Sequence, residues 1–165
     1  MLTRLARLRV PLGFLCAAAA FGLAYPSWQS WSIGLAIALV GESVRVWAAG
    51  HIEKGREITR SGPYRFVRHP LYLGSILLGI GFVTAARSIT VGIVVLLYLA
   101  VTITAAIRTE EAVLNARFSG AYADYRDGTI PPVARPFSLA RAIRNKEYRA
   151  VMGLIAGFAL LVLRM

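Results

Sequence analysis

The sequence predicts an all-α polytopic bundle of transmembrane helices with about five spans. Of its 165 residues, 57% are hydrophobic and only 16% are charged, whereas soluble domains average roughly 45–50% apolar and about 25% charged residues. The apolar residues also gather in long runs, and a helix needs about 20 such residues to cross a bilayer. The length suits one domain, so we expect residues 1–165 to form a single membrane-embedded unit.

Five apolar runs supply the expected spans, at residues 10–25, 31–50, 71–86, 89–107 and 150–163. The first follows three arginines, as in a signal peptide, but no small-residue cleavage site comes after it, so we interpret it as a retained span. The last run is short, and flanking Arg149 and Arg164 could lengthen it by snorkelling. Its Gly153 and Gly157 form a G-x-x-x-G pattern, which permits packing within a monomer or in a weak homodimer.

Charge orients the expected spans in the membrane. The net charge is +11, and sixteen of the nineteen basic residues lie in residues 1–9, 51–68 and 108–149. The positive-inside rule therefore places both long polar regions in the cytoplasm, as in a bacterial inner-membrane protein. In a soluble protein the same excess suggests nucleic acid, but membrane topology accounts for it here, and we expect membrane lipids rather than nucleic acid as partners. Residues 138–149 are basic and amphipathic, which is typical of an interfacial helix.

The layout predicts three parts within the domain. Residues 1–50 would be two accessory spans, residues 51–137 the functional core, and residues 138–165 an interfacial helix with the last span. The third and fourth spans must form an antiparallel hairpin, because only Arg87 and Ser88 join them. Glu42 and Arg45 lie on one face of the second span. Such charges either serve a ligand or lock two helices together.

Two polar points carry the chemistry. Residues 61–74 read SGPYRFVRHPLYLG, and Pro70 would open the third span while keeping His69 out of the helix. The hairpin returns Glu110 and Glu111 to the same membrane face, either as salt-bridge partners or as half of a ligand site. The aromatic stripe of Phe118 and its neighbours at 122 and 125 is more typical of a packing surface. One cysteine, two histidines and scattered acids give no metal-site pattern.

The motifs form a familiar combination. Ser-Gly-Pro-Tyr occupies 61–64, Arg-His-Pro-x-Tyr-x-Gly 68–74, Glu-Glu 110–111 and Phe-x-Gly-x-Tyr-x-x-Tyr 118–125. In this order and spacing they resemble the isoprenylcysteine carboxyl methyltransferase family, which is related to the phospholipid N-methyltransferases. The resemblance runs over residues 44–137. It implies an integral membrane enzyme that uses S-adenosylmethionine, with cytoplasmic loops that bind the cofactor.

The resemblance also implies roles for individual residues. The segment before the turn holds the cofactor largely through backbone, and the turn tyrosine, the His-Pro-x-Tyr residues and a glutamate complete the site. The expected cofactor-binding residues are Arg56, Glu57, Ile58, Thr59, Tyr64, Arg68, His69, Pro70, Leu71, Tyr72, Glu110 and Glu111. Of these, His69, Tyr72 and Glu110 are the expected catalytic residues.

The methyl acceptor is less defined by the sequence. The family has a substrate-binding arginine four residues before the glutamate, where this chain has Ala106. We therefore expect Arg108 and Arg45 to bind the acceptor, a lipid or prenylated small molecule with an isoprenylcysteine-type carboxylate or another isoprenoid or lipid head. Two alternatives remain: an NADPH-dependent reductase resembling the sterol reductases, which are usually longer, and a non-catalytic membrane protein.

Overall fold

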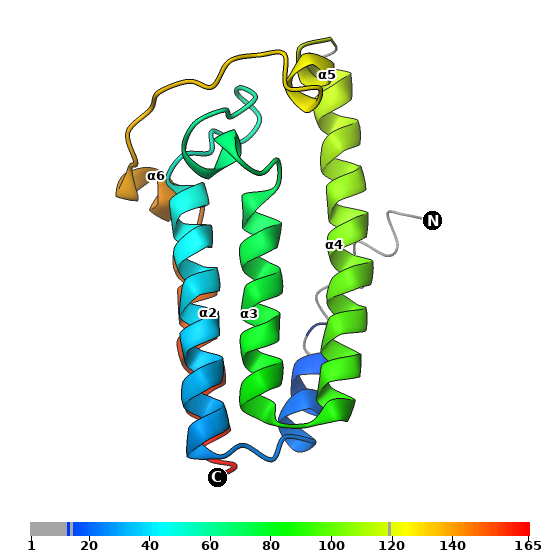
Figure 1. Cartoon of the computed structure of the whole chain (residues 1–165), viewed down its shortest axis with the longest axis vertical. Helices are drawn as coiled ribbons and strands as arrows, with labels where there is room; N and C mark the ends of the chain where they lie inside the picture. The colour runs from blue at the N-terminus through cyan, green and yellow to red at the C-terminus, as the bar shows by residue number, and fades with distance from the viewer. Residues whose placement is uncertain (1–12, 14, 119) are drawn as a thin grey trace.

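The chain folds into a bundle of helices in the computed structural model, which describes residue 13, residues 15–118 and residues 120–165 (Figure 1). No strand occurs among these residues, so the predicted all-α class is confirmed. Residues 15–22 are helical. The arginine-rich residues 1–9, and residues 10–12 and 14 of the first expected span, lie outside the described residues. The elements are α2 (Trp28–Ala49), the 3-10 helix η1 (Gly62–Arg65), α3 (Pro70–Ala86), α4 (Ile89–Phe118), α5 (Gly120–Arg126), α6 (Leu139–Arg144) and α7 (Tyr148–Val162).

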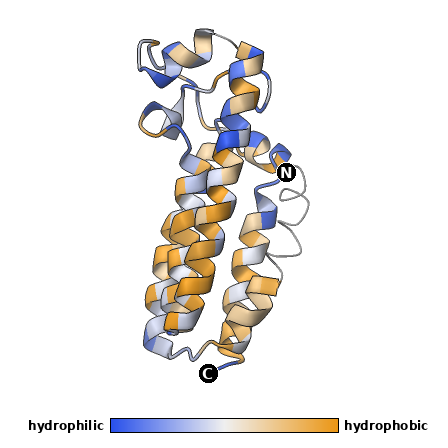
Figure 2. Cartoon of the chain, turned by 90° about the vertical axis from the view of Figure 1, so that its right-hand side faces the viewer, coloured by the Kyte–Doolittle hydropathy of each residue, from blue (hydrophilic) through white to orange (hydrophobic). Residues whose placement is uncertain are grey.

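Within the part of the chain that the structure describes, two helices are long and apolar enough to cross a membrane, α2 with 22 residues and α4 with 30. The apolar helices α3 and α7 have 17 and 15 residues, which at 1.5 Å per residue is roughly 25 and 22 Å. Figure 2 shows hydrophobic residues along the helices and hydrophilic residues gathered in the loops at one end. The number of spans and the side that the loops face stay predictions.

Helix ends follow local sequence signals. Ser27 caps α2 and forms a capping box with Ser30, in which each side chain accepts a hydrogen bond from the other's backbone N–H. The helix therefore begins three residues before the predicted start at residue 31. Pro70 opens α3 as predicted, and Arg87 ends it in the left-handed conformation with φ of 51°. Because α4 begins at Ile89, the predicted hairpin turn is confirmed.

Helices α2 and α3 approach closely because glycines face each other along their contact. A Cβ on Gly41 would lie 2.8 Å from the carbonyl oxygen of Gly74, and one on Gly81 would lie 2.6 Å from that of Gly34. Any side chain at these positions would separate the backbones. This pair of helices forms the main packed layer of the bundle (Figure 1), and it fixes where α3 begins.

Helix α4 runs without a break beyond the expected end of the fourth span. No glycine or proline occurs between residues 93 and 118, so nothing in the sequence stops the helix near residue 107. Glu110 and Glu111 therefore lie within a helix rather than at its end. The helical spacing from residue 110 to 125 also predicts the helical structure described there, in α4 up to Phe118 and in α5 from Gly120.

The C-terminal segment returns to the end of α2. Residues 138–149 do not form one amphipathic helix, because α6 ends at Arg144 and a turn precedes α7. The Asn145 side chain donates hydrogen bonds to the carbonyls of Ala49 (2.9 Å) and Ile52 (3.1 Å), and the Arg141 guanidinium donates to Gly50. Backbone carbonyls at the end of α2, which have no partner within the helix, thus accept hydrogen bonds from these side chains, one of which is cationic. The contact ties the expected N-terminal and C-terminal parts together.

Candidate ligand-binding cleft

A cleft of about 920 Å³ lies at the polar end of the bundle. Its walls come from the loop at residues 52–59, η1, the start of α3, one face of α4, α5 and the turn between α6 and α7. Along α4 its lining runs from Val101 to Phe118, roughly 25 Å at 1.5 Å per residue. Val101, Ala105 and Ala106 make the deeper part of that wall apolar, while Glu110 and Arg117 make the other end polar. The cleft therefore suits an amphiphilic ligand or two ligands of different polarity.

His69 and the glutamate pair meet in this cleft. The His69 Nε2 atom lies 3.1 Å from Glu111 Oε1, and Nδ1 lies 4.0 Å from Glu110 Oε2. A carboxylate only accepts hydrogen bonds, so the Nε2–H donates to Glu111. This leaves Nδ1 as the ring atom with a lone pair when the imidazole is neutral. The ring centroid of Tyr72 is 5.8 Å from that of His69.

The Tyr64 hydroxyl is buried and has no hydrogen-bond partner among the described residues. The backbone carbonyl of Tyr64 accepts a 3.1 Å hydrogen bond from the Tyr125 hydroxyl, which fixes η1 against α5. Burial first, and then the charge of Glu110, raise the pKa of Tyr64 far above its usual range. The phenol therefore stays protonated at neutral pH and can donate to a ligand. A buried donor without a partner is costly, which makes it a marker of a binding site.

Aromatic residues of α5 close the same side. Tyr122 is 2% exposed, and burial together with the nearby Glu111 raises its pKa to about 12. Phe118, Tyr122 and Tyr125 all line the cleft. The aromatic stripe in the sequence is thus part of the wall, rather than a surface that packs on the membrane.

An ion pair closes the inner end of the cleft. The Arg45 Nε atom lies 2.7 Å from Oε1 of Glu147, the residue before α7, and 3.8 Å from Glu42 Oε2 within α2. Arg45 also donates a 2.5 Å hydrogen bond to the Ser75 hydroxyl. The guanidinium therefore joins α2, α3 and α7. Of the two interpretations left open by the sequence, the helix-locking one has direct contacts, and Arg45 also lines the cleft.

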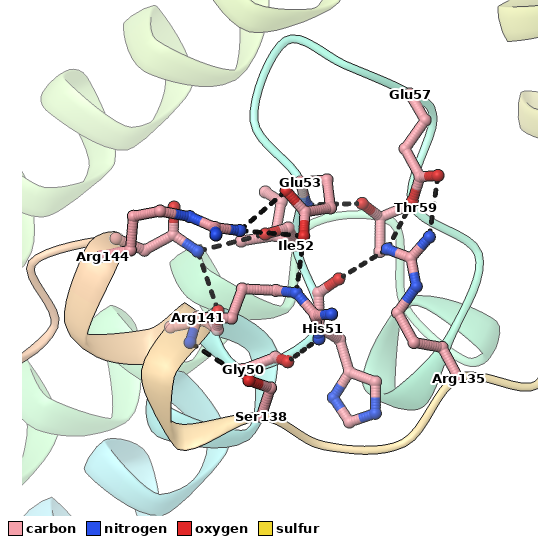
Figure 3. A network of polar contacts seen from close by, with 12 residues as sticks. Gly50, His51, Ile52, Glu53, Glu57, Thr59, Arg135, Ser138, Arg141 and Arg144 are labelled. Atoms are coloured by element: carbon pink, nitrogen blue, oxygen red, sulfur yellow. Dashed lines mark hydrogen bonds and ion pairs between the residues drawn. The ribbon is translucent and has the colours of Figure 1, made fainter.

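A second polar network holds the outer loop (Figure 3). Glu53 pairs with Arg141 at 2.7 Å and with Arg144 at 2.9 Å, and Glu57 pairs with Arg135 at 2.6 Å. The Thr59 hydroxyl accepts a hydrogen bond from the Glu53 backbone N–H. The hydrogen bond from Arg141 is the main cause that lowers the pKa of Glu53. This network, which we call the loop clasp, ties the loop of residues 53–59 to the C-terminal segment.

The Glu53 carboxylate of the loop clasp should make the stability of the fold depend on pH. Because the pKa of Glu53 is lower in the folded chain than in the unfolded one, its stabilising effect is present above the ordinary glutamate pKa and is lost as pH falls through the folded value. Wild type and Glu53→Gln should thus differ in melting temperature at pH 7, and the difference should shrink as the pH falls below the ordinary glutamate pKa. Asp127→Asn removes an exposed pair with Arg126 and serves as control. A difference between wild type and Glu53→Gln that is constant with pH would contradict the prediction.

Most of the residues predicted from the sequence lie around the cleft. The lining includes Arg45, Glu57, Ile58, Thr59, Tyr64, Arg68, His69, Leu71, Tyr72 and Glu110. Glu111 contacts His69, and Pro70 is buried at the start of α3. Arg56 instead lines a smaller cavity of about 280 Å³ behind the loop. Arg108 is exposed on α4 and lines neither cavity, so the structure does not bring it to the other predicted residues.

The sequence prediction missed the residues that the C-terminal segment brings to the cleft. Asn145, Lys146, Glu147 and Arg149 belong to its lining, although they lie far along the chain from the motifs. Their only signal in the sequence was a basic amphipathic pattern, which pointed to the membrane surface. The aromatic residues of α5 had a clearer signal in their helical spacing.

The fold and the cleft define a helical, membrane-associated protein with a large amphiphilic binding site. A profile of the phospholipid methyltransferase family matches residues 8–121, which is more than half of the chain. The chain therefore belongs to the phospholipid methyltransferase family. This confirms the resemblance found in the sequence motifs.

Two curated relatives match about half of this chain. The cobalt-zinc-cadmium resistance protein CzcN of Cupriavidus metallidurans is 38% identical over 90 residues, which cover 52% of this chain and 39% of that protein. The nickel-cobalt-cadmium resistance protein NccN of Alcaligenes xylosoxydans xylosoxydans is 34% identical over 88 residues, or 52% of this chain and 40% of that protein. The matches thus span about two fifths of the length of these relatives. No solved structure matches the chain.

Proposed function

We propose that the protein is a membrane methyltransferase that transfers a methyl group from S-adenosylmethionine to a lipid-like acceptor. The observation that carries the proposal is the buried, unpartnered Tyr64 hydroxyl in a cleft that also holds His69 and Glu110, in a chain of a methyltransferase family. The volume of about 920 Å³ lies in the upper part of the range of small-molecule sites. The site would face the cytoplasm, as the distribution of basic residues favours.

The residues present fit the functional groups of the cofactor. S-adenosylmethionine carries an amine, a carboxylate, ribose hydroxyls and a sulfonium, so its site needs both signs of charge and neutral donors. Glu110 would take the amine or the ribose hydroxyls, and Arg68 or His69 would take the carboxylate. Tyr64 would donate to a cofactor oxygen, and the loop of residues 57–59 would contribute backbone groups. When bound, the cofactor supplies a methyl group activated by the sulfonium.

The protein's part in the reaction is to align the reactants and exclude water. Methyl transfer is an in-line displacement in which little net charge develops, so positioning carries most of the catalysis. A carboxylate acceptor needs no base. For an amine acceptor, His69 Nδ1 would accept the proton, because Nε2 already donates to Glu111. The apolar wall of Val101, Ala105 and Ala106 would hold the hydrocarbon part of the acceptor.

The relatives' names concern resistance to divalent metals. Among the described residues no group of three or more histidine, cysteine, aspartate or glutamate side chains could hold a metal ion. The proposal therefore rests on the family and the cleft rather than on those names.

The test is a titration of the detergent-solubilised full chain with two ligands. We expect S-adenosylhomocysteine, the product of the methyl donor, to bind with a measurable heat in calorimetry, and NADPH not to bind. Binding of NADPH without binding of S-adenosylhomocysteine would overturn the proposal in favour of the reductase. Failure of both ligands to bind would favour the non-catalytic alternative.

A further inference from the structure

The turn between α6 and α7 (residues 145–147) and the first residues of α7 contribute to the cleft from outside the residues that match the family, which end at 121. Its Asn145, Lys146, Glu147 and Arg149 all belong to the lining. Two anchors hold the turn in place. Asn145 donates hydrogen bonds to two carbonyls at the end of α2, and Glu147 pairs with Arg45 at 2.7 Å.

The backbone of this turn is a Schellman motif with an unusual residue. The Lys146 N–H donates to the carbonyl of Ile143 (2.8 Å) and the Glu147 N–H to that of Ala142 (3.2 Å), the two bonds that define the motif. Lys146 has a φ of 63° at the position where glycine is usual, because a Cβ crowds the backbone in this conformation. A lysine at this position is therefore uncommon, and it adds a cation to the lining of the cleft.

The charges around the cleft leave Lys146 and Arg149 available. The Arg45 guanidinium is engaged by Glu147 and Glu42, whereas Lys146 and Arg149 form no ion pair with a described acidic residue, as is also true of Lys54, Arg68 and Arg117 in the same lining. The buried Tyr64 hydroxyl has no hydrogen-bond partner among the described residues. The charges of Glu110 and Glu147 both contribute to raising the pKa of Tyr64, so both carboxylates lie near it. Ala150, next to Arg149, continues the lining towards the apolar part of α7. Of these cations, Lys146 and Arg149 are the ones next to Ala150, the residue of α7 that lines the cleft with an apolar side chain.

We propose that Lys146 and Arg149 bind an anionic group, a phosphate or a carboxylate, on the head of the methyl acceptor. This inference rests on the proposed function and assigns the acceptor's charge. A phospholipid and a free isoprenoid acid or phosphate share this chemistry. The C-terminal segment would then select the acceptor, while the family-matched residues hold the methyl donor.

The test compares ligands with one tail and different heads on the full chain in neutral detergent. We expect farnesyl phosphate and farnesoic acid to bind at least tenfold more tightly than farnesol, measured by tryptophan fluorescence. Lys146→Gly and Arg149→Gln should each weaken binding of the two anions at least fivefold and leave farnesol unchanged. Dihexanoyl phosphatidic acid against farnesyl phosphate distinguishes a lipid head from a free isoprenoid anion, and tighter binding of either supports the anion subsite.

Matched controls separate this subsite from other effects. Arg65→Gln removes the same charge at an exposed side chain of η1 that lies outside the cleft and forms no ion pair with a described acidic residue, so an equal loss of anion binding there would overturn the proposal in favour of diffuse surface attraction. Equal affinity of wild type for the anions and farnesol would also overturn it.

Lys146→Gly should keep or raise the melting temperature, because it relieves the positive φ. A loss of farnesol binding in this variant would show a structural role and overturn the proposal. S-adenosylhomocysteine affinity, measured in parallel, should stay unchanged in both variants. If wild type binds the anions selectively but no S-adenosylhomocysteine, the methyltransferase proposal fails while the anion subsite stands.

Discussion

His69→Ala and Glu110→Ala are each expected to weaken S-adenosylhomocysteine binding at least tenfold, or by more than about 1.4 kcal/mol. The reason is that both side chains line the cleft. His69 also donates a hydrogen bond to Glu111 and lies 4.0 Å from Glu110, so the two side chains can contact the same ligand. A charged hydrogen bond to a ligand contributes about 1.5–3 kcal/mol, which is enough for the expected loss.

Calorimetric titration of the detergent-solubilised variants measures this effect. Arg108→Ala is the matched control, because Arg108 lies two residues before Glu110 on the same helix but is exposed and outside the cleft. We expect its affinity to equal that of wild type. Unchanged affinity in both His69→Ala and Glu110→Ala would mean that the cofactor binds elsewhere. A loss in Arg108→Ala as large as in Glu110→Ala would point to a general effect on α4.

Local signals in the sequence predicted much of the fold. Pro70 fixed the start of α3, and the two residues between α3 and α4 required a hairpin. That hairpin is why His69 and Glu111, 42 residues apart, lie 3.1 Å apart. The motifs, which lie between residues 44 and 137, also indicated the family whose profile matches residues 8–121. Each of these predictions depended on a short range of residues whose geometry allows few alternatives.

Contacts between distant segments could not be read from the sequence. Glu53 pairs with Arg141, and Arg45 with Glu147, but any of several basic residues could have met each acid by sequence alone. The fourth span was expected to end near residue 107, whereas helical spacing predicted the helix that follows over residues 110–125. Arg108 shows the opposite error: it was chosen because it is near Glu110 in sequence, and its position on the helix turns it to the outside.

Gly81→Ala is expected to lower the stability of the bundle by about 1–3 kcal/mol, the usual cost of overpacking. A Cβ at residue 81 would lie 2.6 Å from the carbonyl oxygen of Gly34 and 2.8 Å from the Cβ of Ala38. Both neighbours belong to α2, whose backbone cannot give way without moving the whole helix. The helices must therefore separate, and Gly81→Leu should have a larger effect than Gly81→Ala.

Gly153→Ala is the matched control for this prediction, because a Cβ there meets no atom within 4 Å. Alanine should be neutral at that position or stabilise α7 through its higher helix propensity. The melting temperature of the full chain in detergent, with and without S-adenosylhomocysteine, measures both variants. Equal melting temperatures for Gly81→Ala and Gly153→Ala would contradict the close packing of α2 on α3.

Gly74→Ala extends the argument to the cleft, because its Cβ would meet the Arg45 side chain as well as the Gly41 carbonyl. We therefore expect Gly74→Ala to disturb the Arg45–Glu147 pair and so the anion subsite, whereas Gly81→Ala lowers stability without changing the relative affinities for farnesyl phosphate and farnesol.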